Sequence, residues 1–116
     1  MFTQSKNNII TVNRGDTFTI TLPINVGTPT DPRFHELVEG DKVYFGLMEP
    51  NQPFEYALIR KVYDTTNQSG FILDMEFNPE DTEELLPGKY YYSIKLQTAR
   101  GEVFTILPKT IFTIID

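Results

Sequence analysis

Cysteine and tryptophan are absent from this chain of 116 residues, and histidine occurs only once. Without cysteine there can be no disulfide framework, no thiolate zinc site and no cysteine nucleophile. The single His35 excludes metal centres and acid–base pairs that need two imidazoles. No apolar run approaches the roughly 20 residues that span a bilayer, and residues 1–8 lack the apolar segment of a signal peptide. We therefore expect no membrane partner and no secretion.

Positive charge is scarce as well. Ten basic side chains stand against 16 acidic ones, and the formal net charge is −6. Because phosphate contacts need a basic surface, this balance argues against a nucleic-acid partner. The length suits one domain, residues 1–116, with a single core, and we expect residues 1–8 to be a flexible arm. The lack of cysteine suits a protein that folds in a reducing cytoplasm.

The composition favours strands over helices. Alanine, the best helix former, occurs only at positions 57 and 99. Threonine (14 residues), isoleucine (11), phenylalanine (9) and tyrosine (6) are abundant, and such β-branched and aromatic residues suit a pleated sheet. The 8 prolines and 7 glycines interrupt the chain at short intervals. These frequencies predict an all-β protein.

Hydrophobic alternation locates the strands. In residues 17–24, apolar side chains at every second position share one face, as in a strand with one buried side. Pro23 cannot donate to a ladder, which predicts an edge position or a bulge there. Residues 42–48 are apolar on both faces and predict a central strand. Related patterns predict further strands at 9–12, 55–63, 71–77, 90–97, 103–107 and 110–115.

Residues 78–86 break this alternation and predict a single helical turn. Asn78 suits the N-cap and Pro79 the first helical position. The acidic residues that follow complement the helix dipole. We expect Leu85 and Leu86 to hold the turn against the core.

Seven to eight short strands at near-regular spacing, with one short helical turn, predict an immunoglobulin-like antiparallel β-sandwich. The order fits, because a long loop at 27–41 follows the second predicted strand and Gly88-x-Tyr90 opens the penultimate one. One tyrosine of that strand is expected to make the tyrosine-corner hydrogen bond. The Cys–Trp–Cys signature of antibody domains is missing, and a small closed barrel is the alternative fold.

The chemistry-bearing side chains do not form a catalytic pattern. The acidic run at 80–84 lacks the spacing of a calcium loop and fits a solvated turn. His35 lies near Asp31, Glu36 and Glu39, which could suit a general base or a metal ligand. No second histidine and no nucleophile motif accompanies it. Carboxylate pairs like those of glycosidases arise by chance among 16 acids. We expect no enzyme activity, no metal and no cofactor.

Tyrosine is the side chain that best suits a binding role. We expect Tyr90 and Tyr92 to face the core and Tyr91 to serve an interface. An exposed platform of Tyr91 with Tyr44 or Tyr63 would instead suit sugar stacking, although tryptophan is the preferred platform. A carbohydrate-binding module is therefore the alternative function.

Several segments together resemble a known family. The chain resembles small structural proteins of tailed phages and prophages of Gram-positive and gut bacteria. It is similar in layout to the N-terminal immunoglobulin-like domain of phage baseplate upper proteins, over roughly residues 9–115. The segments that carry the resemblance are Arg14-Gly15-Asp16-Thr17-Phe18, Gly40 to Gly46 with Glu49-Pro50-Asn51, Pro79 to Thr82 with Leu85 to Tyr92, and Pro108 to Phe112.

The resemblance implies a virion component that is made in the host cytoplasm and docks into a baseplate, tail or capsid. It implies protein–protein assembly contacts with other virion proteins or with copies of the same chain, and no catalytic site. Edge strands suit such contacts, and we expect residues 9–12 and 110–115 to lie at sheet edges. The last strand is apolar on both faces. The interface candidates are Ile10, Val12, Tyr91, Ile111, Phe112 and Ile115.

Overall fold

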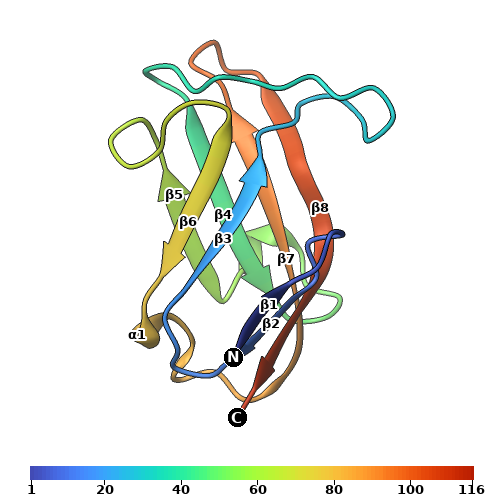
Figure 1. Cartoon of the computed structure of the whole chain (residues 1–116), viewed down its shortest axis with the longest axis vertical. Helices are drawn as coiled ribbons and strands as arrows, with labels where there is room; N and C mark the ends of the chain where they lie inside the picture. Colours follow the sequence, from blue (N-terminus) through green and yellow to red (C-terminus); the bar gives the residue numbers. More distant parts are fainter.

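Two β-sheets face each other in the computed structural model, which describes all residues from Met1 to Asp116 (Figure 1). The larger sheet has six strands in the order β1-β2-β8-β7-β4-β5, and the smaller sheet pairs β3 with β6. The strands are β1 (Phe2–Gln4), β2 (Ile10–Asn13), β3 (Phe18–Pro23), β4 (Lys42–Met48), β5 (Ile59–Tyr63), β6 (Ile72–Phe77), β7 (Gly88–Gln97) and β8 (Val103–Ile115). A 3-10 turn, η1 (Phe54–Tyr56), and one helical turn, α1 (Pro79–Thr82), complete the elements.

The predicted all-β sandwich is confirmed, and its strand order is immunoglobulin-like. β7 lies between β8 and β4 in one sheet, opposite the β3–β6 pair in the other. One pair departs from the antiparallel prediction, because β2 runs parallel to β8. Both chain ends lie at the same end of the molecule (Figure 1). No helix in the structure is long and apolar enough to cross a membrane.

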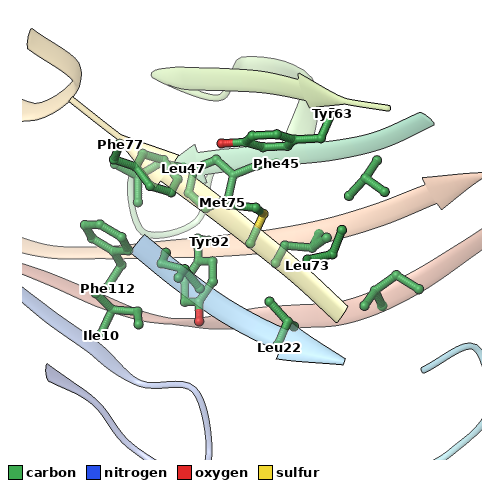
Figure 2. Close-up of a cluster of buried hydrophobic side chains, with 14 of the residues drawn as sticks. Ile10, Leu22, Phe45, Leu47, Tyr63, Leu73, Met75, Phe77, Tyr92 and Phe112 are labelled. Atoms are coloured by element: carbon green, nitrogen blue, oxygen red, sulfur yellow. The ribbon is translucent and has the colours of Figure 1, made fainter. Parts of the chain in front are cut away.

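The core lies between the sheets and is built by strand alternation. β3 and β6 alternate strictly between buried and exposed residues, and β4 and β7 supply most of the opposite wall. Aromatic rings dominate the centre (Figure 2). Phe18 stacks on Phe77 with 4.7 Å between ring centroids, and Phe45 meets Phe77 edge-on at 4.9 Å. Such pairs contribute about 0.5–1.5 kcal/mol beyond the apolar area that they bury.

Pro23 lies at a sheet edge, as predicted. β3 has only β6 as a ladder partner, and the backbone of Thr21 faces away from β6, where it bonds to a side chain. Backbone groups two residues apart point the same way, so the nitrogen of Pro23 also faces away from β6. The missing N–H therefore removes no ladder bond.

The last strand is longer than predicted. Residues 103–115 form one strand, β8, although Pro108 was expected to divide it. Two register shifts against β7, between Tyr92 and Ile94 and between Ile94 and Lys95, absorb the irregularity near the proline.

The helical turn is confirmed with one exception. Asp81 accepts a hydrogen bond from the Asn78 backbone N–H at 2.7 Å, which is half of a capping box. Leu85 packs against the core, but Leu86 is 75% exposed and does not hold the turn in place. The carbonyl of Leu86 instead accepts the predicted tyrosine-corner bond from the Tyr90 hydroxyl at 2.6 Å.

The N-terminal residues are not a flexible arm. Residues 2–4 form β1, which pairs antiparallel with β2. Phe2 stacks on Phe18 at 5.4 Å between centroids, and the terminal amine lies 3.1 Å from the Asp16 carboxylate. An apolar residue at position 2 with a partner in the core explains the order of this segment.

Candidate interaction surfaces

Half of the predicted interface residues face the core. Ile10 and Val12 are fully buried, and Phe112 is 1% exposed. Phe112 also packs edge-on against the Tyr92 ring at 5.7 Å. These three side chains cannot meet a partner, and their prediction as interface residues was wrong. The sequence pattern identified the strands correctly but did not show which face of each strand is inside.

The predicted edge positions were also wrong. β2 lies between β1 and β8, and residues 112–114 of β8 lie between β2 and β7. The outermost strands of the larger sheet are β1 and β5. The first half of β8 has only β7 beside it, because β2 reaches no further than Phe112. The open edge of β8 therefore lies in its first half, whereas the prediction placed the edge at residues 110–115.

Tyr91, Ile111 and Ile115 lie on the outer face of the larger sheet. Tyr91 pairs directly with Ile111 across β7 and β8, and Ile115 follows on the same face of β8. All three are half-buried. The Lys89 Nζ atom sits 5.8 Å from the centre of the Tyr91 ring, within reach of a cation–π contact. The fold thus places Tyr91 beside Ile111, with Ile115 further along β8 on the same face. We call these three residues the outer-face cluster.

A neighbouring part of that outer face is already covered by the chain itself. Phe54 of η1 rests on Gly46 of β4, where an added Cβ atom would lie 2.6 Å from the ring. The Lys95 Nζ atom lies 4.8 Å from the centre of the same ring. Lys109 donates to the carbonyl of Gln52 at 2.5 Å and holds the loop to β8. A glycine inside an otherwise apolar strand was the available signal for this close approach.

The three tyrosines of the alternative sugar platform do not form one surface. Tyr63 faces the core and is 7% exposed (Figure 2). Tyr44 pairs with Lys95, while Tyr91 pairs with Met48 at the other end of β4. Phe54 on Gly46 lies between these two positions. Stacking on Tyr91 together with Tyr44 or Tyr63 is therefore not available.

Glutamine amides cap both edges of the smaller sheet. The Gln4 side chain donates to the carbonyl of Thr21 at 2.7 Å and accepts from its N–H at 3.2 Å. Gln68 does the same for Asp74, with both distances at 2.8 Å. Thr21 and Asp74 are partners in the β3–β6 ladder. The two amides thus extend one ladder rung outward on each side, at positions where a further strand would otherwise pair.

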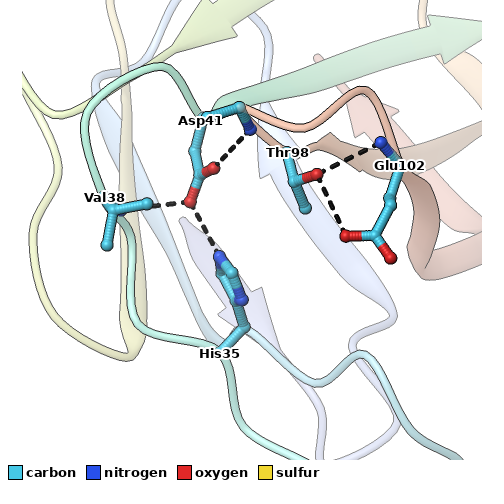
Figure 3. A network of polar contacts seen from close by, with 6 residues as sticks. His35, Val38, Asp41, Thr98 and Glu102 are labelled. Atoms are coloured by element: carbon cyan, nitrogen blue, oxygen red, sulfur yellow. Dashed lines mark hydrogen bonds and ion pairs between the residues drawn. The ribbon is translucent and has the colours of Figure 1, made fainter.

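His35 is a structural residue in this fold. Its Nε2 atom lies 2.7 Å from the Asp41 carboxylate, not beside Asp31, Glu36 or Glu39 (Figure 3). Asp41 is almost fully buried and also accepts from the N–H groups of Val38 and Ala99, at 3.0 and 2.9 Å. Burial alone would raise the pKa of Asp41, but these bonds together lower it. The pair ties the long loop to the turn that joins β7 and β8.

Two hollows lie where the sheets separate. One, of about 360 Å³, lies beside β6 and is lined by Tyr63, Asn67, Gln68, Asp74, Glu76 and Asn78. We call it the polar hollow. The other, of about 310 Å³, opens between the C-terminal end of β3 and the middle of β8 and has several prolines in its wall. Sequence reasoning missed both: the second combines segments distant in the chain, and the first depends on how the loop after β5 folds against β6.

No group of three or more histidine or acidic side chains converges in a way that could hold a metal ion. The acidic residues at 80–84 belong to α1 and the turn after it. Comparison with known proteins finds no protein-family model that matches the chain and no curated protein that matches it.

Proposed function

We propose that the chain is a non-catalytic structural or adaptor protein of a phage virion, which acts through protein–protein contacts in a baseplate, tail or capsid. The observation that carries this proposal is the outer-face cluster. Tyr91, Ile111 and Ile115 are apolar, face away from the core and lie on neighbouring strands. Aromatic and aliphatic side chains in such positions are the usual anchors of protein interfaces.

The rigidity of this surface supports the same proposal. β7 and β8 are the longest strands and are paired along most of their length. Their inner faces carry Tyr92 and Phe112, which are locked in the core. A surface built on such strands has little conformational entropy to lose on binding, which favours repeated assembly contacts.

The test is incorporation into particles. Virions released by a bacterium that encodes the chain are purified by density gradient, and their proteins are quantified by mass spectrometry. We expect the chain in constant proportion to the major structural proteins. Ile111→Asp should lower its incorporation by about tenfold or more, which corresponds to an anchor worth at least about 1.4 kcal/mol.

Val62→Asp is the matched control, because Val62 is an exposed β-branched residue on the larger sheet, on β5. Circular dichroism and thermal unfolding show whether each variant is folded. Particles that lack the wild-type chain, or that take up folded Ile111→Asp as well as the control, would refute the proposal.

A further inference from the structure

The first half of β8 presents an open strand edge. β7 pairs with it on one side, and β2 pairs with β8 only from Phe112 onward. The Thr98 N–H donates to the carbonyl of Glu102 at 2.8 Å, so the backbone of Glu102 faces β7. Because backbone groups alternate in direction along a strand, those of Val103 and Thr105 face away from β7. No strand of the chain lies on that side to receive their N–H and carbonyl groups (Figure 1).

The other edges of the two sheets are protected against further pairing. The side chains of Gln4 and Gln68 cap the two strands of the smaller sheet. β1 ends the larger sheet with only three residues, and β5 at the opposite end carries Arg60 and Lys61. Short strands and charged side chains on an edge discourage pairing with other chains. Residues 103–107 of β8 contain no charged side chain and no cap, so this edge is available to an added strand.

The hollow of about 310 Å³ lies directly beside this open edge. Residues 105–108 of β8 line one side of it, and the end of β3 with the loop that follows lines the other. Unlike the polar hollow, it has no charged side chain in its wall, so a group that enters it must be uncharged. Its volume lies at the lower end of the range for small-molecule sites, about 300–1,000 Å³. A space of this size holds part of one extended segment, not the face of a folded domain.

The chain itself shows what fits on this side of β8. Residues 112–115 of β8 pair there with β2 as a parallel ladder, and the carbonyl of Ile115 accepts from the Arg14 N–H at 2.7 Å. Asn8, two residues before β2, lines the hollow. The hollow therefore begins where the β1–β2 hairpin ends. An extended segment placed in it would continue the line of β2 along the same edge of β8.

We propose that the first half of β8 binds an extended, uncharged segment of a partner protein as an added strand. The backbone of the segment bonds to the N–H and carbonyl groups of Val103 and Thr105, and an apolar side chain enters the hollow beside Leu22 and Ile106. The main-chain bonds supply affinity, and the hollow selects the side chain. This surface differs from the outer-face cluster, and it does not require that the protein belong to a virion.

The test starts from a library of random decapeptides displayed on yeast and selected for binding to the full chain. We expect the enriched peptides to share a central run of uncharged, β-branched residues without proline. A synthetic copy of the best binder should protect the amides of Val103 and Thr105 from hydrogen exchange and leave those of residues 10–13 unchanged. N-methylation of every second residue of the central run should abolish binding in one phase and spare it in the other, because only alternate N–H groups of an added strand point at β8.

Thr105→Pro tests the same bonds from the side of the protein. It removes an N–H that faces away from β7, so it costs no ladder bond within the chain, and it should weaken peptide binding at least tenfold. Thr105→Val is the matched control, because it keeps the N–H and a β-branched side chain, and it should bind like the wild type. Circular dichroism and thermal unfolding show whether both variants are folded. If the proline variant does not fold, the N-methylated peptides decide the question in the wild-type chain.

The proposal is wrong if no peptide of the library binds the folded chain, or if the selected peptides protect residues 59–63 of β5 instead. It is also wrong if folded Thr105→Pro and both N-methylated forms bind as tightly as the unmodified pair. Protection of Val103 and Thr105 that rises with protein concentration without any peptide, together with a dimer in light scattering, would assign this edge to a second copy of the chain and overturn the proposal as well.

Discussion

Gly46 has no side chain, and Phe54 occupies the space next to it that a Cβ atom would enter. The contact matters because it places η1 on the outer face of β4, beside the half-buried Tyr91 and Ile111. At the scale of single residues, the hydrogen atom at position 46 thus lets the chain cover this part of the sheet with its own Phe54 ring.

The Gly46→Ala variant should be destabilised by about 1–3 kcal/mol, the usual cost of forcing extra volume into a packed contact. In a Phe54→Ala background the same change should cost nearly nothing, because the ring is no longer there to be displaced. Urea unfolding of the wild type, both single variants and the double variant measures this coupling. Additive free energies of unfolding would mean that the ring does not rest on Gly46.

Asp41 gives the protein an acid-sensitive contribution to stability. Its pKa in the folded chain lies below its ordinary value of 3.8, so the unfolded chain binds more protons between those two values. The stabilisation is therefore complete above pH 3.8 and is lost as the pH falls towards the folded-state pKa. Asp41→Asn should cost about 1–3 kcal/mol at neutral pH, because a charged acceptor of three bonds is lost.

The measurement is urea unfolding of wild type and Asp41→Asn between neutral pH and pH 3. The difference between their free energies of unfolding should shrink as the pH falls below 3.8. A difference that stays constant over this range would show that the charge of Asp41 contributes nothing to stability.

At the scale of elements, local pattern predicted what each segment forms but not what it touches. Alternation located the strands, and the helical turn at Asn78 and the tyrosine corner at Tyr90 followed from signals within a few residues of each other. The parallel pairing of β2 with β8 was missed, because its register depends on segments from opposite ends of the chain. The caps by Gln4 and Gln68 were missed as well, because the sequence around a glutamine does not show which backbone groups its side chain will bond.

Gln68→Ala should destabilise the protein by about 1–3 kcal/mol, because it leaves the backbone N–H and carbonyl of Asp74 without partners in a part-buried place. Gln4→Ala should cost less, because Thr21 is exposed and water can replace the amide. Hydrogen exchange reports each cap directly: Gln68→Ala should speed exchange at Asp74, and Gln4→Ala at Thr21.

Gln52→Ala is the control for both caps, because the Gln52 side chain makes no hydrogen bond and only its backbone N–H and carbonyl are bonded. Unchanged exchange at Asp74 in folded Gln68→Ala would show that this amide does not cap the edge of β6.

At the scale of the whole molecule, β8 joins the two halves of the larger sheet. It pairs with β7 along most of its length and carries β2 on its other side, and β2 is the only ladder partner of β1. Its last residues bury Phe112 and Ile114 in the core. The end of the chain therefore holds its beginning in place.

Deletion of residues 111–116 should abolish cooperative folding. Truncation of a buried large side chain costs about 2–5 kcal/mol. The deletion removes two such side chains and the partner of β2, against a total stability of about 5–15 kcal/mol for a typical domain. Far-ultraviolet circular dichroism and thermal unfolding test this expectation. A cooperative transition in the truncated chain would contradict it, and loss of assembly in that variant would report unfolding, not a lost interface.

The pairing of Ile10 with Phe112 also sets an order in time. The ribosome makes β2 before β3 to β7, and it makes the partner of β2 in β8 only after them. The smaller sheet and the β4–β5 and β4–β7 pairs can form before β8 is made, but β1 and β2 must wait for β8. Contacts so distant along a chain slow folding. We therefore expect β1 and β2 to be the last strands to acquire their native place, once β8 has been made.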